Sequence, residues 1–445
     1  MTEARKKIAD KFLETKNIRI RDHQRTNLLN ANLVDVITQD ARKMFSKQTA
    51  DEIIERMTPI NVFRKIVTKQ AKTYLEEPTR SNTKKDEGDS EQVQHIVEMI
   101  NLNDLMDMVE ERLVSHKRVM VGLGFDGEKF EPEILEPEYY YVDGFPANPN
   151  FVVKATLLDL SDLTQLELVV IYKDRIEVID GHGAVKSTTE NNLGFIPYFE
   201  IGASIATVQP EDRDTLTMSK IIPIIASDVS YVIKYQAWSV IHTVGMKEAD
   251  IKWMPNTIIS SDFGGEDGTQ VPKIDIIKPQ LEIVQTTDWI KFLIANLLSQ
   301  NNLSTSAIST QLGQGQNYAS GIARIIDSAE IIEEQKSRRN VLRAAERKIL
   351  QICQSWYEAV GKIGNFSGFT PDFKLQLAFA QPSPVMSESD KLKLSQQRID
   401  AGFSTLRREL AVIYPEMDEK EIEKLIEEIE EDRANRLVDL VTPNA

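Results

Sequence analysis

Residues 122–127 read GLGFDG and match the G-x-G-x-x-G pattern of dinucleotide-binding loops. In such a loop the glycines close a strand and open a helix, whose N-terminus then meets the pyrophosphate. Here the pattern is followed by EKFEPEIL, and Asp126-Gly127 is typical of a two-residue hairpin turn. The sequence therefore predicts a β-hairpin at this place and no nucleotide site.

A second candidate for chemistry is the acidic stretch DFGGEDG, which could in principle bind Ca²⁺ through Asp262, Glu266 and Asp267. The alternating spacing and the terminal Glu of an EF-hand loop are missing. The stretch also begins with the kinase tripeptide DFG, but the HRD loop and the VAIK strand that accompany it in kinases are absent from the sequence. We therefore expect an exposed acidic turn without a metal.

Thiol and imidazole chemistry have little support. Cys353 is the single cysteine, and its helical spacing from Ile349, Ile352 and Trp356 favours a small buried hydrophobic residue over a reactive thiol. The five histidines include no pair at metal-binding spacing. The stretch GQGQNYASG, at 313–321, lacks the Lys-Ser/Thr of a phosphate-binding loop. We expect no enzyme activity, no catalytic residue and no cofactor.

The composition is that of an ordinary soluble protein in a cytosol-like compartment. The chain has 445 residues, 41% hydrophobic and 27% charged, which suggests several folding units. No apolar stretch approaches the ~18 residues that span a bilayer. The net charge of −16 argues against a protein that grips nucleic acid tightly. Residues 1–25 are locally basic, with eight Lys/Arg against four Asp/Glu, and predict a solvated arm.

Hydrophobic periodicity indicates both helices and strands in the first half of the chain. An amphipathic helix is predicted over residues 60–77, where apolar residues recur at helical spacing between two prolines. The polar stretch at 79–92 predicts a surface loop, and helical periodicity returns over 93–114. From 118 to 197 the pattern changes to short strands with hairpin turns. The combination indicates an α+β fold.

Two more helices follow, with a short β segment between them. One is predicted over residues 218–245, and the other from an N-cap at Thr286 or Thr287. The strands between them indicate a small module carried by the two helices. The module is flanked by Trp238, Trp253 and Trp289. We favour core anchors for these tryptophans, with stacking on nucleic acid as the alternative.

No charged residue occurs between Lys291 and Arg324, although this composition would place roughly eight or nine charges there. The longest helix is predicted next, from Gly321 to about Val360, with a polar centre, EEQKSRRN, that should be solvated or face a neighbouring chain. A strand at FKLQLAFA precedes a helical end, from Ser387 to about Asp439, with a solvated carboxylate-rich face.

The order of these features resembles the portal proteins of tailed bacteriophages. The resemblance is carried by NVFRKIVTKQAKTYLEEP, VGLGFDGEKFEPEILEPEYYYVD, LGFIPYFEI, NYASGIARIIDSAEIIEEQ and IDAGFSTLRRELAVIYPEMDEKEIEKLIEE, which together span roughly residues 60–430. None of these pieces is as specific as a Walker loop, but they occur in order around a helix, hairpin, helix insertion. The short tail after Asp432 departs from a long coiled crown.

The resemblance implies an α+β portal fold with a wing, a stem, a clip and a crown. Its parts would be the N-terminal part of an α/β wing at 1–216, a stem helix at 217–245, a clip at 246–285, a second stem helix at 286–303, a tunnel loop at 304–320, a long helix with a wing strand at 321–385, and a helical C-terminal crown at 386–445.

The resemblance also implies partners and a location. Portal subunits form a homo-oligomeric ring, usually of twelve copies, at one capsid vertex of the virion, and the ring is assembled in the host cytoplasm. Double-stranded DNA passes through it during packaging and ejection, and no membrane is involved. The implied protein partners are the large terminase subunit, the major capsid protein and a head-tail adaptor. Asp262, Glu266 and Asp267 would contact the terminase and the adaptor.

The uncharged segment would then be the tunnel loop, with DNA-facing residues Gln311, Gly313, Gln314, Gly315, Gln316 and Asn317. Duplex DNA carries about one charge per 1.7 Å, so a cationic loop would form ion pairs that must break at every step of translocation. Neutral amides make replaceable hydrogen bonds, often through water. Without the resemblance, a surface connector with no ligand is the simpler interpretation of this loop.

Two other functions stay open at this point. One is a non-enzymatic α+β scaffold or adaptor that binds proteins without DNA passage. It predicts no ring, and no packaging defect when Gln314 and Gln316 are changed to glutamate. The other is a phosphate-chemistry enzyme that uses residues 122–127. It would need nucleotide binding that is lost in Gly124→Val.

Overall fold

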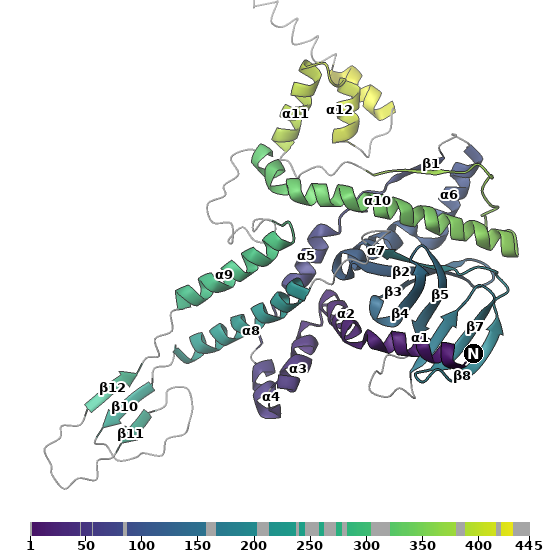
Figure 1. Cartoon of the computed structure of the whole chain (residues 1–445). Coiled ribbons are helices and arrows are strands. Elements are labelled where there is room, and N and C mark those ends of the chain that lie inside the picture. The colour runs from purple at the N-terminus through teal and green to yellow at the C-terminus, as the bar shows by residue number, and fades with distance from the viewer. Residues whose placement is uncertain are drawn as a thin grey trace, which may run out of the picture. The chain divides into compact units, whose positions relative to one another are not determined.

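The computed structural model describes residues 2–44, 46–55, 57–82, 87–156, 166–202, 213–236, 240–244, 258–261, 273–277, 283–303, 321–379, 388–414 and 420–429. Helices and strands are mixed, so the α+β class is confirmed (Figure 1). Contacts divide the chain into two compact units. The first comprises residues 1–315 and 330–380, and the second comprises 316–329 and 381–445.

The first unit begins with short helices, α1 (Thr2–Glu14), α2 (Lys16–Leu29), α3 (Leu33–Met44), α4 (Lys47–Glu55) and α5 (Val62–Gln70). The prediction of a solvated basic arm at 1–25 is wrong, because α1 and α2 are packed into this unit. Ile8 and Phe12 of α1 are buried, and so are Arg19 and Arg25 of α2. Part of the charge that suggested a solvated arm is therefore internal.

An antiparallel sheet with the strand order β4-β5-β6-β7-β8 lies against α1. Its strands are β4 (Tyr140–Phe145), β5 (Asn148–Ala155), β6 (Glu167–Ile171), β7 (Arg175–Asp180) and β8 (Val185–Glu190). Arg5 of α1 donates two hydrogen bonds to the Glu177 carboxylate, at 2.9 and 2.8 Å. Gly183, with φ +82°, lets α1 approach closely, since a Cβ there would lie 2.7 Å from the Lys6 nitrogen.

A second sheet, with the order β3-β2-β9, contains the GLGFDG stretch. Its strands are β2 (Arg118–Phe125), β3 (Phe130–Leu135) and β9 (Tyr198–Gly202). The predicted hairpin is confirmed, but its turn spans residues 126–129 instead of two residues, because Phe125 pairs with Phe130. A strand and not a helix follows Gly127, so the pyrophosphate position of a dinucleotide site is missing here.

Residues 57–116 depart from the predicted helices in length. The predicted helix over 60–77 ends at Gln70, and Leu75 is 75% exposed. The predicted helix over 93–114 is two helices, α6 (Glu87–Ile100) and α7 (Leu102–His116), which are separated by Asn101 in a left-handed conformation with φ 47°. Asparagine is one of the residues that adopt this conformation most readily. The prediction from periodicity located helical regions but not these breaks.

The predicted surface loop at 79–92 is wrong as well. Its first residues form β1 (Thr79–Asn82), which pairs antiparallel with β13 (Leu375–Ala378), and α6 begins at Glu87. Asn82 is buried and donates a hydrogen bond of 2.7 Å to Asp89. The predicted strand at FKLQLAFA is confirmed over 375–378 and supplies the partner that makes a strand of this polar sequence.

The long helix α10 (Gly321–Val360) has the predicted bounds (Figure 1). Its second half lies in the core with α6, α7 and β2, and Trp356 donates a hydrogen bond of 2.8 Å to the Leu123 carbonyl. Cys353 is fully buried, and this burial raises the pKa of its thiol. The expectation of a buried and unreactive cysteine is therefore confirmed.

The prediction of a solvated polar centre of α10 is correct for one side of the helix only, where Glu333, Lys336 and Asn340 are exposed. Gln335 and Arg339 are buried, and Arg338 contacts residues of α5 and α7. The second unit contains α11 (Glu388–Asp400), α12 (Leu406–Ile413) and helical residues 420–429. In the last of these Ile422 is buried while Glu421, Glu423 and Glu428 are exposed, as the predicted carboxylate-rich face requires.

Candidate functional site

The residues predicted to touch DNA or partner proteins lie outside the described residues. Gln311, Gly313, Gln314, Gly315, Gln316 and Asn317 belong to 304–320, and Asp262, Glu266 and Asp267 belong to 262–272. The structure places the elements on either side of both segments. The acidic segment joins β11 to β12, and the uncharged segment joins α9 to α10. The candidate site is therefore built from these flanking elements.

Two helices flank the predicted module, α8 (Arg213–Gln236) and α9 (Ile283–Gln300). The predicted helix over 218–245 is too long, because residues 240–244 form strand β10. The predicted N-cap of the second helix is also wrong, since α9 begins before Thr286. The strands between the helices are β10 (Val240–Val244), β11 (Ile258–Ser261) and β12 (Lys273–Ile277), in the order β11-β10-β12.

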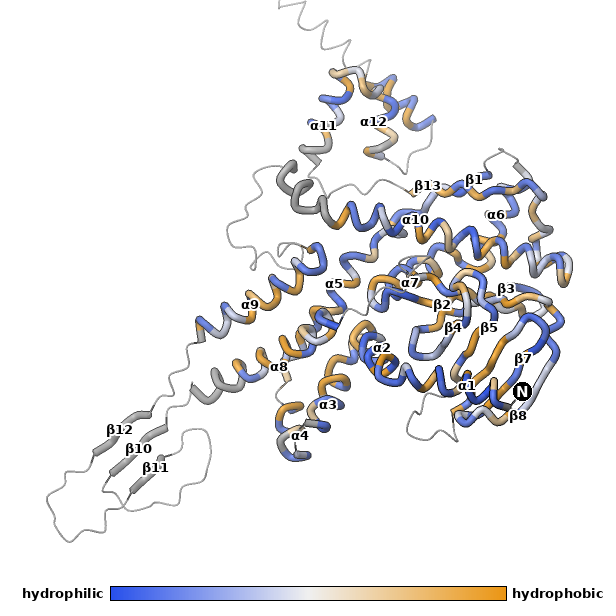
Figure 2. Tube along the Cα trace, viewed as in Figure 1, coloured by the Kyte–Doolittle hydropathy of each residue, from blue (hydrophilic) through white to orange (hydrophobic). Residues whose placement is uncertain are grey.

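The sequence folds this way because α8 and α9 each bury one apolar side. Ile222 of α8 and Leu293, Leu297 and Leu298 of α9 pack in one cluster with Val62 and Ile66 of α5. Figure 2 shows apolar residues, in orange, along both helices. Pro223 lies inside α8, and the hydroxyl of Ser227 donates to its carbonyl at 2.6 Å. The two helices are thus held side by side against α5.

Another side of α9 exposes large apolar side chains, with Gln285 and Asp288 between them. Trp289 is 51% exposed and Phe292 is 56% exposed, and their rings stack with centroids 5.3 Å apart. Val284, near the start of the helix, is 72% exposed. The interpretation of Trp289 as a core anchor is therefore wrong, and the side chains of Trp238 and Trp253 lie outside the described residues. We call Val284, Trp289 and Phe292 the aromatic face of α9.

Sequence reasoning missed this face, although a signal for it was present. Apolar residues occur around most of α9, since Phe292 lies about 120–140° around the helix from the buried Leu297 and Leu298, and Trp289 lies about 180° from Leu298. A helix with apolar residues on nearly every side is typically covered on more than one side. Within the described residues, α8 and α5 cover only one side of α9.

The bases of α8 and α9 meet at a hydrogen-bonded junction. The Asn301 side chain donates to Thr215 Oγ1 at 3.1 Å, and its backbone carbonyl accepts from Gln70 Nε2 at 2.6 Å. Lys220 of α8 also donates to Asp40 of α3, at 2.7 Å. These contacts connect both helices to α3 and α5 and fix where the module leaves the first unit.

A buried ion pair lies beside this junction. Glu110 of α7 is fully buried and accepts hydrogen bonds from the Thr73 backbone at 2.8 Å and from the Thr73 hydroxyl at 2.6 Å. It also accepts from Arg338 of α10 at 3.0 Å. Arg338 in turn donates to the Gln70 carbonyl at 2.9 Å and to Glu334 at 2.8 Å. These contacts explain why one side of the polar centre of α10 is internal.

Another buried group of charges surrounds Arg19 and includes Asp22 and Arg25. The Arg19 guanidinium lies 3.5 Å from the centre of the Phe12 ring and donates to the carbonyls of Pro137, Glu138 and Tyr140 at 2.9–3.0 Å. Burial lowers the pKa of Arg19 to about 9, so the group keeps its proton at neutral pH. Its donors are occupied by backbone carbonyls, which is the pattern of a structural contact.

His116 completes this group and is neutral. Burial, and then repulsion from Arg25, lowers the pKa of His116 to about 3. Its Nδ1 lies 2.7 Å from the Ser115 hydroxyl, and its Nε2 lies 3.2 Å from the Asp22 carbonyl. The geometry fits a neutral imidazole that donates from Nε2 and accepts at Nδ1. A proton shuttle near neutral pH is therefore not supported.

The buried His116 makes stability dependent on pH. Below pH 6.5, the unfolded chain gains a proton that folded His116 does not accept until about pH 3. The free energy of unfolding should therefore fall as pH decreases through this window, by about 1.4 kcal/mol per pH unit from this group. Urea unfolding at about pH 7.5, 6.5 and 5.5 would measure this change in the free energy of unfolding.

His116→Gln is the matched variant, because glutamine can both donate and accept but does not titrate. As pH falls, the free energy of unfolding should decrease less in this variant than in the parent chain. Comparing the two removes the opposite effect of His23, whose pKa is raised by its hydrogen bond to Glu138. Parallel pH curves for the two proteins would contradict the assignment.

Comparisons with known proteins add no relative: no family model and no curated protein matches the chain. Across the described ranges, no group of three or more His, Cys, Asp or Glu is placed to hold a metal ion. In the same ranges every helix is too short or too polar to cross a membrane. The candidate site thus depends on the aromatic face of α9 and on the module that α8 and α9 carry.

Proposed function

We propose that this chain is the subunit of a ring-forming portal protein, through which double-stranded DNA enters and leaves a tailed-phage capsid. The observation that carries the proposal is the aromatic face of α9, on a helix whose other side is already packed against α8. Trp289 and Phe292 form a stacked and exposed aromatic pair, and exposed clusters of apolar side chains mark surfaces that bind other molecules. When such a face meets a different surface of the next copy, the contact is heterologous and repeated copies can close into a ring.

The order of the elements supports the same proposal. α8 and α9 carry a small sheet between them, the uncharged segment follows α9, and α10 comes next. In the proposed ring, α8 and α9 are the stem and the clip starts at β10 instead of residue 246. Residues 304–320 are the tunnel loop. Residues 1–216 and 321–385 belong to the wing, and residues 386–445 form the crown.

The charge distribution supports a lining that lets DNA slide. The chain carries a net charge of −16, and residues 292–323 contain no charge at all. In the proposed ring, Gln314 and Gln316 exchange hydrogen bonds with successive phosphates, and acidic walls repel the duplex within a Debye length of about 8 Å. Such a lining favours slippage over grip, and the force for packaging comes from a separate terminase.

The proposed ring also has protein partners. The segment that contains Asp262, Glu266 and Asp267 joins two strands of the small sheet, and in the proposal it contacts the large terminase subunit and later the head-tail adaptor. The major capsid protein surrounds the wing at one vertex. No catalytic residue and no cofactor is part of this proposal.

Negative-stain electron microscopy and light scattering of the purified chain test the proposal. We expect rings of about twelve copies, each of 50.5 kDa, with a central channel wide enough for a double helix. Association driven by apolar contacts should persist over a range of salt concentrations. A chain that stays monomeric at high concentration would contradict the portal proposal. It would favour the alternative of an α+β scaffold or adaptor that binds proteins without DNA passage.

A further inference from the structure

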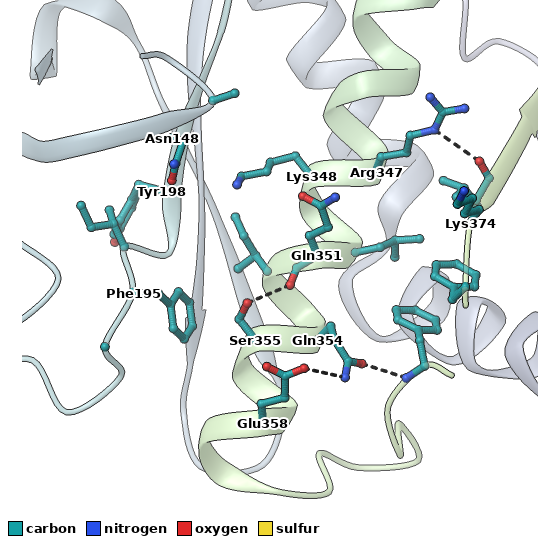
Figure 3. Close-up of a pocket in the computed structure, with 18 of the residues that line it drawn as sticks. Asn148, Phe195, Tyr198, Arg347, Lys348, Gln351, Gln354, Ser355, Glu358 and Lys374 are labelled. Carbon is teal, nitrogen blue, oxygen red and sulfur yellow. Dashed lines mark hydrogen bonds between the residues drawn. The ribbon is translucent and has the colours of Figure 1, made fainter. Parts of the chain in front are cut away.

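An open cleft of about 960 Å³ lies along the exposed side of α10, far in sequence from α8 and α9 (Figure 3). Its floor consists of successive turns of α10, from Arg347 to Glu358. One wall is formed by the β4–β5 hairpin and by residues 194–198, which lead into β9. The other wall is the segment 369–375, which leads into β13. The cleft is therefore a trough with a helical floor and two walls.

The trough is strongly cationic, although the chain as a whole is acidic. Its lining includes Lys173, Arg347, Lys348 and Lys374, against Glu358 as the single carboxylate. Burial, and then repulsion from Lys173, lowers the pKa of Lys348. Within the described part of the chain, no hydrogen bond or ion pair engages the Lys348 or Lys173 amine. Two neighbouring cations without a carboxylate between them favour an external anion.

The positive charges do not converge on one point. Figure 3 shows Lys348 directed toward Asn148 and Tyr198, whereas Arg347 is directed to the other side, toward Lys374. Consecutive residues on a helix diverge by about 100°, which explains the two directions. Arg347 keeps its orientation by donating from Nε to the Leu375 carbonyl at 3.3 Å. A single compact anion would therefore reach only one of the two groups.

The rest of the floor is suited to a polypeptide backbone. Gln351 lies between the two cationic sides in Figure 3, and no hydrogen bond occupies its side-chain amide among the described residues. One turn further, Gln354 is already held, because it donates to Glu358 at 3.0 Å and accepts from the Phe369 backbone at 2.8 Å. An amide that can both donate and accept, between cations on each side, matches the repeating groups of a peptide.

We propose that this trough binds an extended, carboxylate-rich peptide segment of a partner protein. In an extended segment, successive side chains point to opposite sides. One carboxylate of an adjacent pair would reach Lys348 and Lys173, and the next would reach Arg347. Gln351 would hydrogen bond the backbone between them. This site is independent of the aromatic face of α9 and of ring formation.

A second copy of this chain is a poorer match than another protein. None of the described strands carries two acidic residues at adjacent positions. The most acidic, β3, alternates Glu131 and Glu133 with Pro132, and Glu133 already pairs with Lys154. The adjacent and exposed Glu76 and Glu77 lie in a bend between α5 and β1 instead of in an extended strand. The described residues of a second copy therefore offer no extended strand with adjacent carboxylates, and we assign the occupant to a partner protein.

Fluorescence anisotropy on the purified full-length chain tests the proposal. The probe is a labelled short peptide whose central residues are glutamates, and the reference probe has glutamines in their place. We expect binding of the glutamate peptide alone, weakened about tenfold in Lys348→Gln and again in Arg347→Gln, since one ion pair in a partly desolvated cleft is worth about 1.4 kcal/mol. Lys65→Gln, an exposed lysine on α5 outside the trough, should bind as the parent chain does.

Three outcomes would overturn the proposal. Equal affinities for Lys348→Gln and the parent chain would remove the trough as the site. Full competition by inorganic phosphate, with loss in only one of the two variants, would indicate a compact anion site. A change of oligomeric state in the variants, measured by light scattering with peptide binding intact, would indicate an interface between copies. Circular dichroism on each variant shows that it is folded. A parent chain that forms no rings but binds the glutamate peptide would contradict the portal proposal and leave the peptide site supported.

Discussion

Changing Trp289 and Phe292 together to glutamate is expected to convert the proposed rings into separate subunits. Each aromatic side chain is about half exposed in the single chain and would be buried by a neighbouring copy. Burying a fully exposed side chain of this size contributes about 1.5–3 kcal/mol, so burying the exposed halves of these two should contribute about 1.5–3 kcal/mol together, a factor of roughly 10 to 150 in each subunit contact, and the two glutamates add the cost of burying charge. Light scattering and electron microscopy would measure the loss of rings.

Two control variants separate this effect from misfolding or added charge. Phe145→Glu adds one of the two negative charges at an aromatic residue that is 77% exposed on β4, and should leave the assembly unchanged. Trp289→Phe keeps the apolar contact and should preserve the rings. If the double glutamate variant still forms rings, the aromatic face does not join subunits, and the proposed portal loses the observation on which it depends.

The second large effect is expected at Glu110, beside the junction of α8 and α9. Glu110→Ala removes the acceptor for both Thr73 donors and leaves the Arg338 guanidinium short of a partner in the interior. Breaking a buried ion pair on one side costs about 3–5 kcal/mol. Urea unfolding at neutral pH should show this loss as a lower midpoint with an unchanged slope.

A pair of further variants tests whether the charge is the cause. Glu334→Ala removes the more exposed carboxylate partner of Arg338, and should cost about 1 kcal/mol or less. Glu110→Leu combined with Arg338→Met replaces the pair with apolar groups and should be more stable than Glu110→Ala, since no unpaired charge remains. If this double variant is less stable than Glu110→Ala, packing and not charge pairing accounts for the loss.

The elements that the sequence predicted well are those whose signal is local. α10 has the predicted bounds because apolar residues recur at helical spacing over its whole length. The hairpin at 118–135 was predicted because an Asp-Gly pair separates two strands. Cys353 was assigned to the core from three neighbouring apolar residues. In each case the residues that determine the structure lie within a few positions of one another.

The failures occur where the partner is distant in the sequence. β1 reads TRSN and becomes a strand only because β13, almost three hundred residues later, pairs with it. Arg19 is buried because carbonyls near residue 138 accept its hydrogen bonds. Arg338 is internal because Glu110 lies opposite. Periodicity assigns such polar residues to the solvent, since it has no information on long-range pairing.

At the candidate site one prediction from the sequence succeeded and two failed. The helix, strand, helix order around the module was predicted, but the end of α8 was not, because the Val-Ile-rich stretch at 240–244 is as apolar as a helix face and forms β10. Trp289 was assigned to the core, since aromatic residues usually are buried. Only the packing of α8 on one side of α9 shows that the other side is exposed.

The contact between Thr215 and Asn301 has a consequence for how this protein can vary. The long excursion through α8, the small sheet and α9 leaves and returns at one point, where these two side chains are 3.1 Å apart. A segment with neighbouring ends can be lengthened, trimmed or exchanged without moving the rest of the backbone. The strands and loops between α8 and α9 could therefore be replaced by those of another protein. If the surfaces of both helices that pack on α5 are kept, the chimaera should bind different partners while the rest of the first unit folds unchanged.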